Sequence, residues 1–110
     1  MEADPVPTGS FDDLDLSPAL RQGVADAGFV ELRPIQAAAL PAALGGRDVL
    51  GLARTGTGKT AAFALPILQR LEGRPAEAGR PRALVLAPTR ELARQIEGDL
   101  VDLGRHLSVR

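Results

Sequence analysis

The sequence contains no cysteine, and His106 is the one histidine among its 110 residues. The absence of cysteine excludes disulfide bonds and thiolate metal sites. A lone histidine with no other ligand residue in view favours a solvated surface side chain. The net charge of −1 at pH 7 gives the chain no overall attraction to nucleic acid, so any such binding has to come from locally placed groups.

Long apolar runs are absent as well. No apolar stretch reaches the roughly 18 residues that a membrane-spanning helix needs, and the acidic N-terminus does not look like a secretory signal. We therefore expect a soluble protein of a reducing, cytoplasmic compartment, with no membrane partner. A hydrophobic content of 45% with 25% charged residues is globular, and the length suits one small domain or part of a larger one.

The most informative segment is 53–60, Ala-Arg-Thr-Gly-Thr-Gly-Lys-Thr. Glycines such as Gly56 and Gly58 let backbone N–H groups converge on a phosphate without a Cβ in the way. Lys59 can reach the terminal phosphates, and the hydroxyl of Thr60 can bind Mg²⁺. The strict pattern has glycine at the position of Ala53, so this is a variant of the phosphate-binding loop.

Short apolar runs alternate with amphipathic segments on both sides of this loop. Residues 1–10 are polar and contain Pro5 and Pro7, which predicts a disordered tail. Further along, the pattern predicts helices at 17–27, 34–44, 61–71 and 90–103, strands at 48–52 and 83–87, and the start of a third strand at 107–109. This alternation predicts an α/β fold with a parallel sheet covered by helices.

Two further segments indicate a family. One is Gly-Phe-Val-Glu-Leu-Arg-Pro-Ile-Gln at 28–36, with Phe11 upstream of it, and the other is Pro-Thr-Arg-Glu-Leu-Ala at 88–93. Together with 53–60, these resemble in order and spacing the first three motifs of DEAD-box RNA helicases, most closely those of bacteria. The resemblance implies that residues 11–110 are part of a helicase ATP-binding domain, an incomplete RecA-like P-loop domain with a parallel sheet flanked by helices.

By this resemblance, Gln36 reads the adenine of ATP, because a carboxamide matches the N6 donor and N7 acceptor of that base. Phe11 stacks on the base, as the upstream aromatic of the family does. Lys59 contacts the β- and γ-phosphates and Thr60 holds Mg²⁺, which makes these two the catalytic candidates. The implied nucleotide-binding residues are Phe11, Gln36, Thr55, Gly56, Thr57, Gly58, Lys59 and Thr60.

The resemblance also implies that Pro88, Thr89 and Arg90 grip the sugar-phosphate backbone of RNA. A hydroxyl, helix-start amides and an arginine suit phosphate oxygens and carry no information about base sequence. Outside the motif context, Arg90 is a solvated charge, Gln36 a polar helix residue and Phe11 a core anchor. Arg33 stands where the family often has threonine or serine, so the usual cap of the 34–44 helix is missing.

The chain contains no Asp-Glu-Ala-Asp segment, which in the family positions Mg²⁺ and the attacking water. We therefore interpret it as a piece that is truncated before that motif and that binds ATP or ADP without hydrolysing ATP. Two alternatives remain. One is a P-loop ATPase unrelated to RNA, and the other is a non-catalytic nucleotide-binding module.

Overall fold

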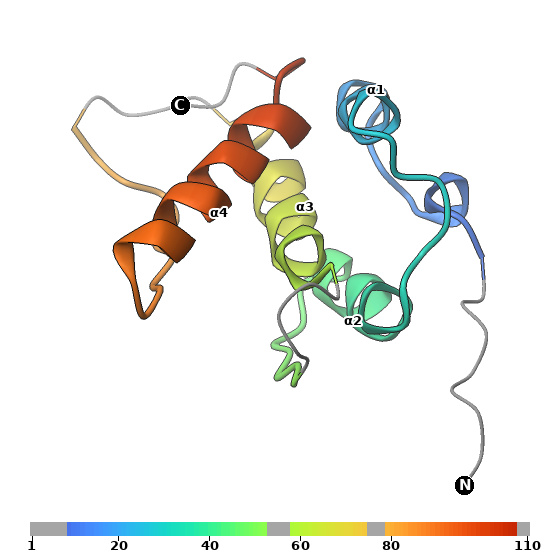
Figure 1. Cartoon of the computed structure of the whole chain (residues 1–110). Helices are drawn as coiled ribbons and strands as arrows, with labels where there is room; N and C mark the ends of the chain where they lie inside the picture. The colour runs from blue at the N-terminus through green and yellow to red at the C-terminus, as the bar shows by residue number, and fades with distance from the viewer. Residues whose placement is uncertain (1–8, 53–57, 75–78, 108–110) are drawn as a thin grey trace, which may run out of the picture.

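The computed structural model describes residues 9–52, 58–74 and 79–107, and the regular secondary structure within them is helical (Figure 1). One isolated antiparallel bridge joins Ser10 to Glu31. In chain order the elements are η1 (Phe11–Asp13), α1 (Pro18–Asp26), α2 (Pro34–Leu44), α3 (Lys59–Leu71) and α4 (Arg90–Leu103). The predicted tail falls mostly on residues outside the described part of the chain.

Local sequence signals mark where the helices begin. Ser17 caps α1 by accepting a hydrogen bond of 3.2 Å from the Leu20 amide, and Thr89 caps α4 in the same way. Gly58 precedes α3 with a φ of 85°, a left-handed conformation that glycine adopts without a Cβ penalty.

The predicted bounds of α2 and α4 are confirmed. Helix α1 is shorter than predicted by one residue at each end, and α3 begins two residues earlier than predicted.

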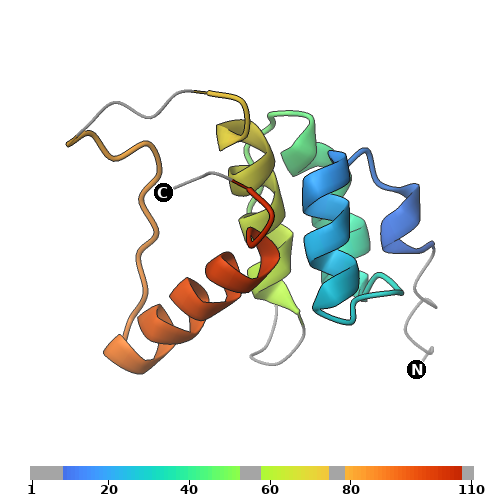
Figure 2. The ribbon, with the colours of Figure 1, turned by 90° about the horizontal axis from the view of Figure 1, so that it is seen from above.

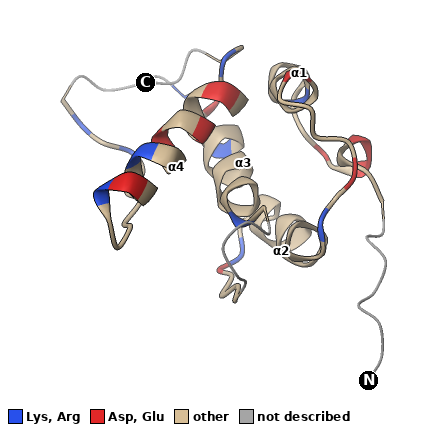
Figure 3. Ribbon diagram, in the orientation of Figure 1, with Lys and Arg blue, Asp and Glu red and all other residues tan. Residues whose placement is uncertain are grey.

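Helix α3 lies at the centre of the molecule and packs mainly against α2 (Figures 1 and 2). Helix α4 crosses its other side, and α1 contacts both α3 and α4. The core between these elements is almost wholly aliphatic, and its buried members are Phe11, Leu14, Leu16, Leu20, Val24, Leu32, Leu40, Ala61, Ala64, Leu65, Leu68 and Leu103. Figure 3 shows acidic and basic residues spread along α4, whereas α2 carries none.

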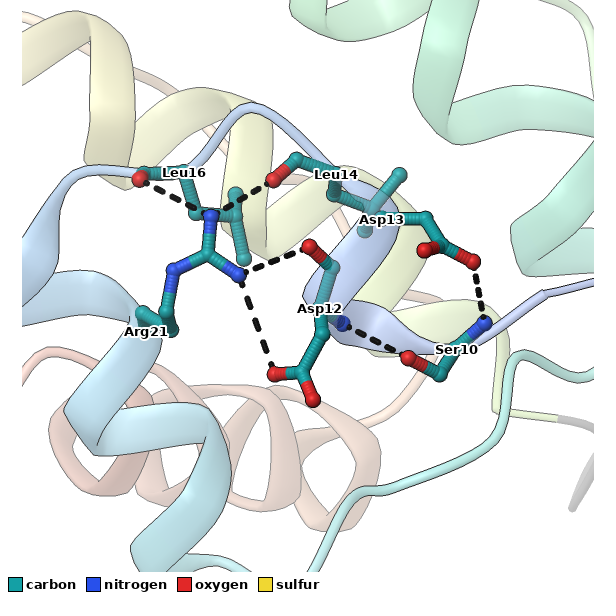
Figure 4. Close-up of polar contacts among 6 residues, drawn as sticks. All are labelled: Ser10, Asp12, Asp13, Leu14, Leu16 and Arg21. Carbon is teal, nitrogen blue, oxygen red and sulfur yellow. Dashed lines mark hydrogen bonds and ion pairs between the residues drawn. The ribbon is translucent and has the colours of Figure 1, made fainter.

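The guanidinium of Arg21, on α1, holds the turn of η1 in place (Figure 4). It donates to the carbonyl oxygens of Asp12 at 3.0 Å and Leu14 at 2.8 Å, and lies 3.7 Å from the carboxylate of Asp12. These contacts satisfy carbonyls that η1 leaves without a helical partner. They fix the segment that carries Phe11 against α1.

The predicted parallel sheet is not confirmed. Segments 48–52 and 83–87 are without strand structure in the described residues, because neither is hydrogen-bonded into a ladder with the other. Their apolar side chains are exposed instead, by 88% at Leu50 and 83% at Leu86. Segment 79–89 lies at the edge of the molecule opposite α1 (Figure 2), and the predicted third strand falls mostly outside the described residues.

A cavity of about 800 Å³ opens between α2, α3 and residues 47–51. Its lining includes the apolar side chains of Val49, Leu50 and Leu84, which come from the two predicted strands. The residues of α2 and α3 that line it are mostly apolar, among them Ile35, Phe63 and Ile67, as expected of helices that cover a sheet.

Candidate functional site

The described part of the candidate phosphate loop is its end, Gly58, Lys59 and Thr60. Thr55, Gly56 and Thr57 lie outside the described residues. Lys59 is exposed and begins α3, while Thr60 is half-buried in its first turn. The first amides of a helix have no partner within it and carry its partial positive charge, so this end of α3 favours an anion.

Gln36, in α2, is directly connected to this loop. Its side chain is 1% exposed, and its Nε2 donates to the carbonyl oxygen of Gly58 at 3.1 Å. Its Oε1 accepts a hydrogen bond of 2.8 Å from the amide of Arg33. A carboxamide has two N–H donors and an oxygen with two lone pairs, so these two bonds use half of its capacity. The motif at 28–36 indicates Gln36 as a site residue, but no sequence signal indicates its contact with the loop.

The bond from Gln36 to Arg33 also replaces the missing helix cap. Arg33 makes no side-chain cap of its own, but Gln36 is the third residue of α2 and reaches back to the Arg33 amide. That is the second half of a capping box. The start of α2 is therefore satisfied by the residue that the family resemblance assigns to adenine.

Phe11 lies in the core, with 3% of its surface exposed. Its ring stacks on that of Phe29 with centroids 5.5 Å apart and planes 20° from parallel. Phe29 is the more accessible ring, at 37% exposed. Phe29 belongs to the 28–36 segment, but the family resemblance assigns a role to Phe11 and none to Phe29. A stacking role of Phe11 on the base stays a prediction.

Pro88, Thr89 and Arg90 are exposed at the start of α4. The hydroxyl oxygen of Thr89 accepts a hydrogen bond of 3.1 Å from the amide of Leu92, so it caps the helix. Its O–H remains a donor that can reach a phosphate oxygen. Figure 2 shows α3 and α4 both starting toward the lower edge of the molecule in that view. The positive ends of the two helix dipoles therefore face the same side.

His106 is an exposed surface residue, as predicted, but it has a partner that the sequence did not indicate. His106 Nε2 lies 2.6 Å from the carboxylate of Asp26, a residue 80 positions earlier in the sequence.

The described residues hold no group of three or more acidic, histidine or cysteine side chains that could bind a metal ion. No described helix is long and apolar enough to cross a membrane.

Comparisons with known proteins agree on one family. The model of the DEAD/DEAH box helicase family matches residues 33–110. "ATP-dependent RNA helicase RhlB" of Xanthomonas oryzae is 52% identical over all of this chain and 20% of its own length. "ATP-dependent RNA helicase SrmB" of Escherichia coli is 51% identical over 88% of this chain and 22% of its own length. The chain thus spans about a fifth of these curated relatives.

Solved structures give the same likeness. The RNA helicase Prp28 from Chaetomium thermophilum bound to ADP is 42% identical, with a TM-score of 0.84 over 96% of this chain and 26% of that one. A hypothetical ATP-dependent RNA helicase from Sulfolobus tokodaii is 34% identical, with a TM-score of 0.73 over 84% of this chain and 25% of that one.

Proposed function

The chain belongs to the DEAD/DEAH box helicase family, and from that premise we propose that it forms the ATP- and RNA-binding N-terminal part of an ATP-dependent RNA helicase. The observation that carries the proposal is the hydrogen bond from Gln36 to Gly58. It links the residue proposed to read the base with the loop proposed to hold the phosphates. Sequence likeness alone would not require these two segments to touch.

On the adenine side, the half of the Gln36 amide that is not engaged with Arg33 and Gly58 matches one donor and one acceptor of adenine. This pairing selects ATP over GTP. Because Phe11 is buried beneath Phe29, we propose that it supports the base indirectly, through the more exposed ring of Phe29.

On the phosphate side, we propose that the amides of 55–60 surround the phosphates and that Lys59 faces the β- and γ-phosphates. Thr60 offers one hydroxyl oxygen in the first turn of α3. That single donor fits Mg²⁺, which takes most of its ligands from water and phosphate oxygens. When bound, Mg²⁺ neutralises charge on the phosphates.

On the RNA side, Pro88, Thr89 and Arg90 are proposed to bind the sugar-phosphate backbone at the start of α4. Support comes from their exposure and from the helix-start amides beside them. Contacts of this kind hold RNA without reading its sequence. Unwinding of RNA driven by ATP hydrolysis is proposed for the longer helicase, not for these 110 residues alone.

For the 110-residue chain we propose nucleotide binding without turnover, because it holds no Asp-Glu-Ala-Asp segment to position the attacking water. A non-catalytic binding module is therefore the second candidate for the chain by itself. A phosphate-release assay with and without single-stranded RNA tests whether the chain hydrolyses ATP. RNA-stimulated turnover at about 1 s⁻¹ or faster, within the ordinary range of enzymes, contradicts binding without hydrolysis.

The central test is nucleotide binding, measured by titration with fluorescent ADP and GDP. We expect ADP to bind more tightly than GDP. Lys59→Ala should weaken ADP binding about tenfold or more, since a hydrogen bond to a charged group contributes roughly 1.5–3 kcal/mol. Arg70→Ala is the matched control, because it removes a cation from the opposite end of the same helix. Equal losses in both variants, or no binding at all, would reject the proposed site.

A further inference from the structure

Helices α1 and α4 approach each other closely at one point. Gly23 is buried in α1, and a Cβ placed on it would collide with the carbonyl oxygen of Leu103, the last residue of α4. Leu103 itself is 2% exposed. Because only a hydrogen atom fits between these backbones, glycine is required at this contact. Both views show α1 beside the end of α4 (Figures 1 and 2).

One turn beyond this contact, Asp26 and His106 close the same junction. The Nε2 of His106 donates to Oδ2 of Asp26 at 2.6 Å, and Oδ1 accepts from Gln22 at 2.9 Å. The two side chains are 40% and 32% exposed, so the pair lies at the rim of the junction and not in the core. We call this pair the α1–α4 latch.

The charge of Arg105, beyond the end of α4, acts on Asp26, and Arg105 is itself paired with Asp102. The hydrogen bond from His106, then that from Gln22, and more weakly the charge of Arg105, lower the pKa of Asp26 below 3.8. The ionised carboxylate of Asp26 therefore stabilises the folded junction at pH values above its ordinary pKa of 3.8. This stabilisation is lost as the pH falls through the lower pKa that Asp26 has in the folded state.

Helix α1 is also what positions the segment leading to Gln36. The amide of Phe29 donates a hydrogen bond of 3.1 Å to the carbonyl oxygen of Val24 in α1. The amide of Phe11 donates one of 3.0 Å to the carbonyl oxygen of Val30. That segment continues directly into Arg33 and α2. Lys59, by contrast, begins α3, which packs mainly against α2. The adenine side of the candidate site thus depends on α1. Helix α1 also contacts α3, but its hydrogen bond to that helix, from the amide of Ser17 to Gln69, lies at the end of α3 opposite Lys59.

We propose that the α1–α4 latch is a positioning contact that fixes the adenine side of the site, so that affinity for adenine nucleotides depends on His106 while affinity for phosphate groups does not. The inference rests on the proposed nucleotide binding. His106 does not touch nucleotide in this scheme. It acts through Asp26, α1 and the segment that contains Phe29.

The test compares ADP with pyrophosphate, which lacks the base. His106→Ala and Asp26→Asn should each weaken ADP binding between about twofold and thirtyfold, the usual range for a residue that acts at a distance, and leave pyrophosphate binding unchanged. The double variant should lose no more than either single one, because both changes break one contact. His106→Gln, which keeps an N–H donor, should restore part of the ADP affinity.

Asp102→Asn is the control, since Asp102 pairs with Arg105 on its own helix end and lies at the same junction. It should leave both affinities unchanged. Equal losses of ADP and pyrophosphate in His106→Ala would indicate general destabilisation and would overturn the proposal. Unchanged ADP affinity in that variant would overturn it as well.

Amide hydrogen exchange tests the latch even if the chain binds no nucleotide, in which case the proposed function alone has failed. In His106→Ala, exchange should become faster at the amides of Phe11 and Phe29, whose bonds depend on α1. It should be unchanged at Gly45 and Glu72, which cap α2 and α3. Uniformly faster exchange, or none faster at Phe11 and Phe29, would reject the latch as a positioning contact.

Discussion

The side chain of Gln36 donates a hydrogen bond of 3.1 Å to the backbone carbonyl of Gly58, 22 residues further along the chain. The donor is almost fully buried, and the acceptor is the left-handed residue that precedes α3. A substitution at Gly58 therefore also disturbs Gln36, the residue proposed to read the base. This coupling makes Gly58 more sensitive than an ordinary turn glycine.

Gly58→Ala should destabilise the chain more than Gly73→Ala does. Both glycines have a left-handed φ, of 85° and 78°, so alanine at either costs about 1–2 kcal/mol. At Gly58 the new Cβ would also lie 2.5 Å from Nε2 of Gln36, whereas at Gly73 it would meet nothing within 4 Å. The overpacking adds roughly 1–3 kcal/mol. Urea unfolding measures the difference, and equal losses in both variants would show that Gln36 moves aside freely.

Gln36→Ala should both destabilise the chain and remove its preference for ADP over GDP. Leaving the Gly58 carbonyl without its partner costs roughly 1–3 kcal/mol, while pyrophosphate should still bind. Gln95→Ala, at an exposed position of α4, serves as the control and should change neither property. Titration with fluorescent nucleotides provides the measurement. If the unmodified chain binds ADP and GDP equally, Gln36 does not read the base.

The helices could be predicted because their signals are local. Pro34 begins α2 and Gly45 ends it, and Thr89 caps α4, so the sequence alone placed both helices with the bounds that the structure has. The strands at 48–52 and 83–87 were predicted from apolar composition. A strand also needs a hydrogen-bonded neighbour, and composition does not say which segment provides it.

The contacts of the site were harder to predict, since each joins residues that are distant in sequence. A motif could identify Gln36 but not its bond to Gly58, and it could not indicate that the ring of Phe11 stacks on that of Phe29. His106 carried no signal at all. Its partner Asp26 lies on α1, and only the packing of α1 against α4 brings the two together.

Gly23→Ala and Gly98→Ala should have opposite effects on stability. Each glycine lies inside a helix, where alanine is intrinsically better by about 1 kcal/mol. A Cβ at Gly98 would meet nothing within 4 Å, so this variant should be stabilised. A Cβ at Gly23 would collide with the carbonyl of Leu103, and forcing α1 away from α4 should cost roughly 1–3 kcal/mol or more. Thermal unfolding compares them, and stabilisation by Gly23→Ala would contradict the close approach.

If the site is assigned correctly, Arg90→Ala should weaken RNA binding and Lys59→Ala should weaken nucleotide binding. Arg90 is exposed at the start of α4, where its charge is proposed to meet an RNA phosphate. Its removal should weaken binding of single-stranded RNA similarly for different sequences and reduce the slope of log K against log salt by about one. ADP binding should persist. Lys59→Ala should have the reverse effect, with ADP affinity reduced and RNA affinity in the absence of nucleotide retained.

Arg94→Ala is the matched control for Arg90, because it removes the same exposed side chain one turn further along the same helix. A general effect of net charge would appear equally in both variants, since each lowers the charge of the chain by one. A specific phosphate contact would appear only in Arg90→Ala. If the RNA affinity and its salt slope are the same in Arg90→Ala as in the unmodified chain, Arg90 is a solvated surface charge and the start of α4 does not hold RNA through it.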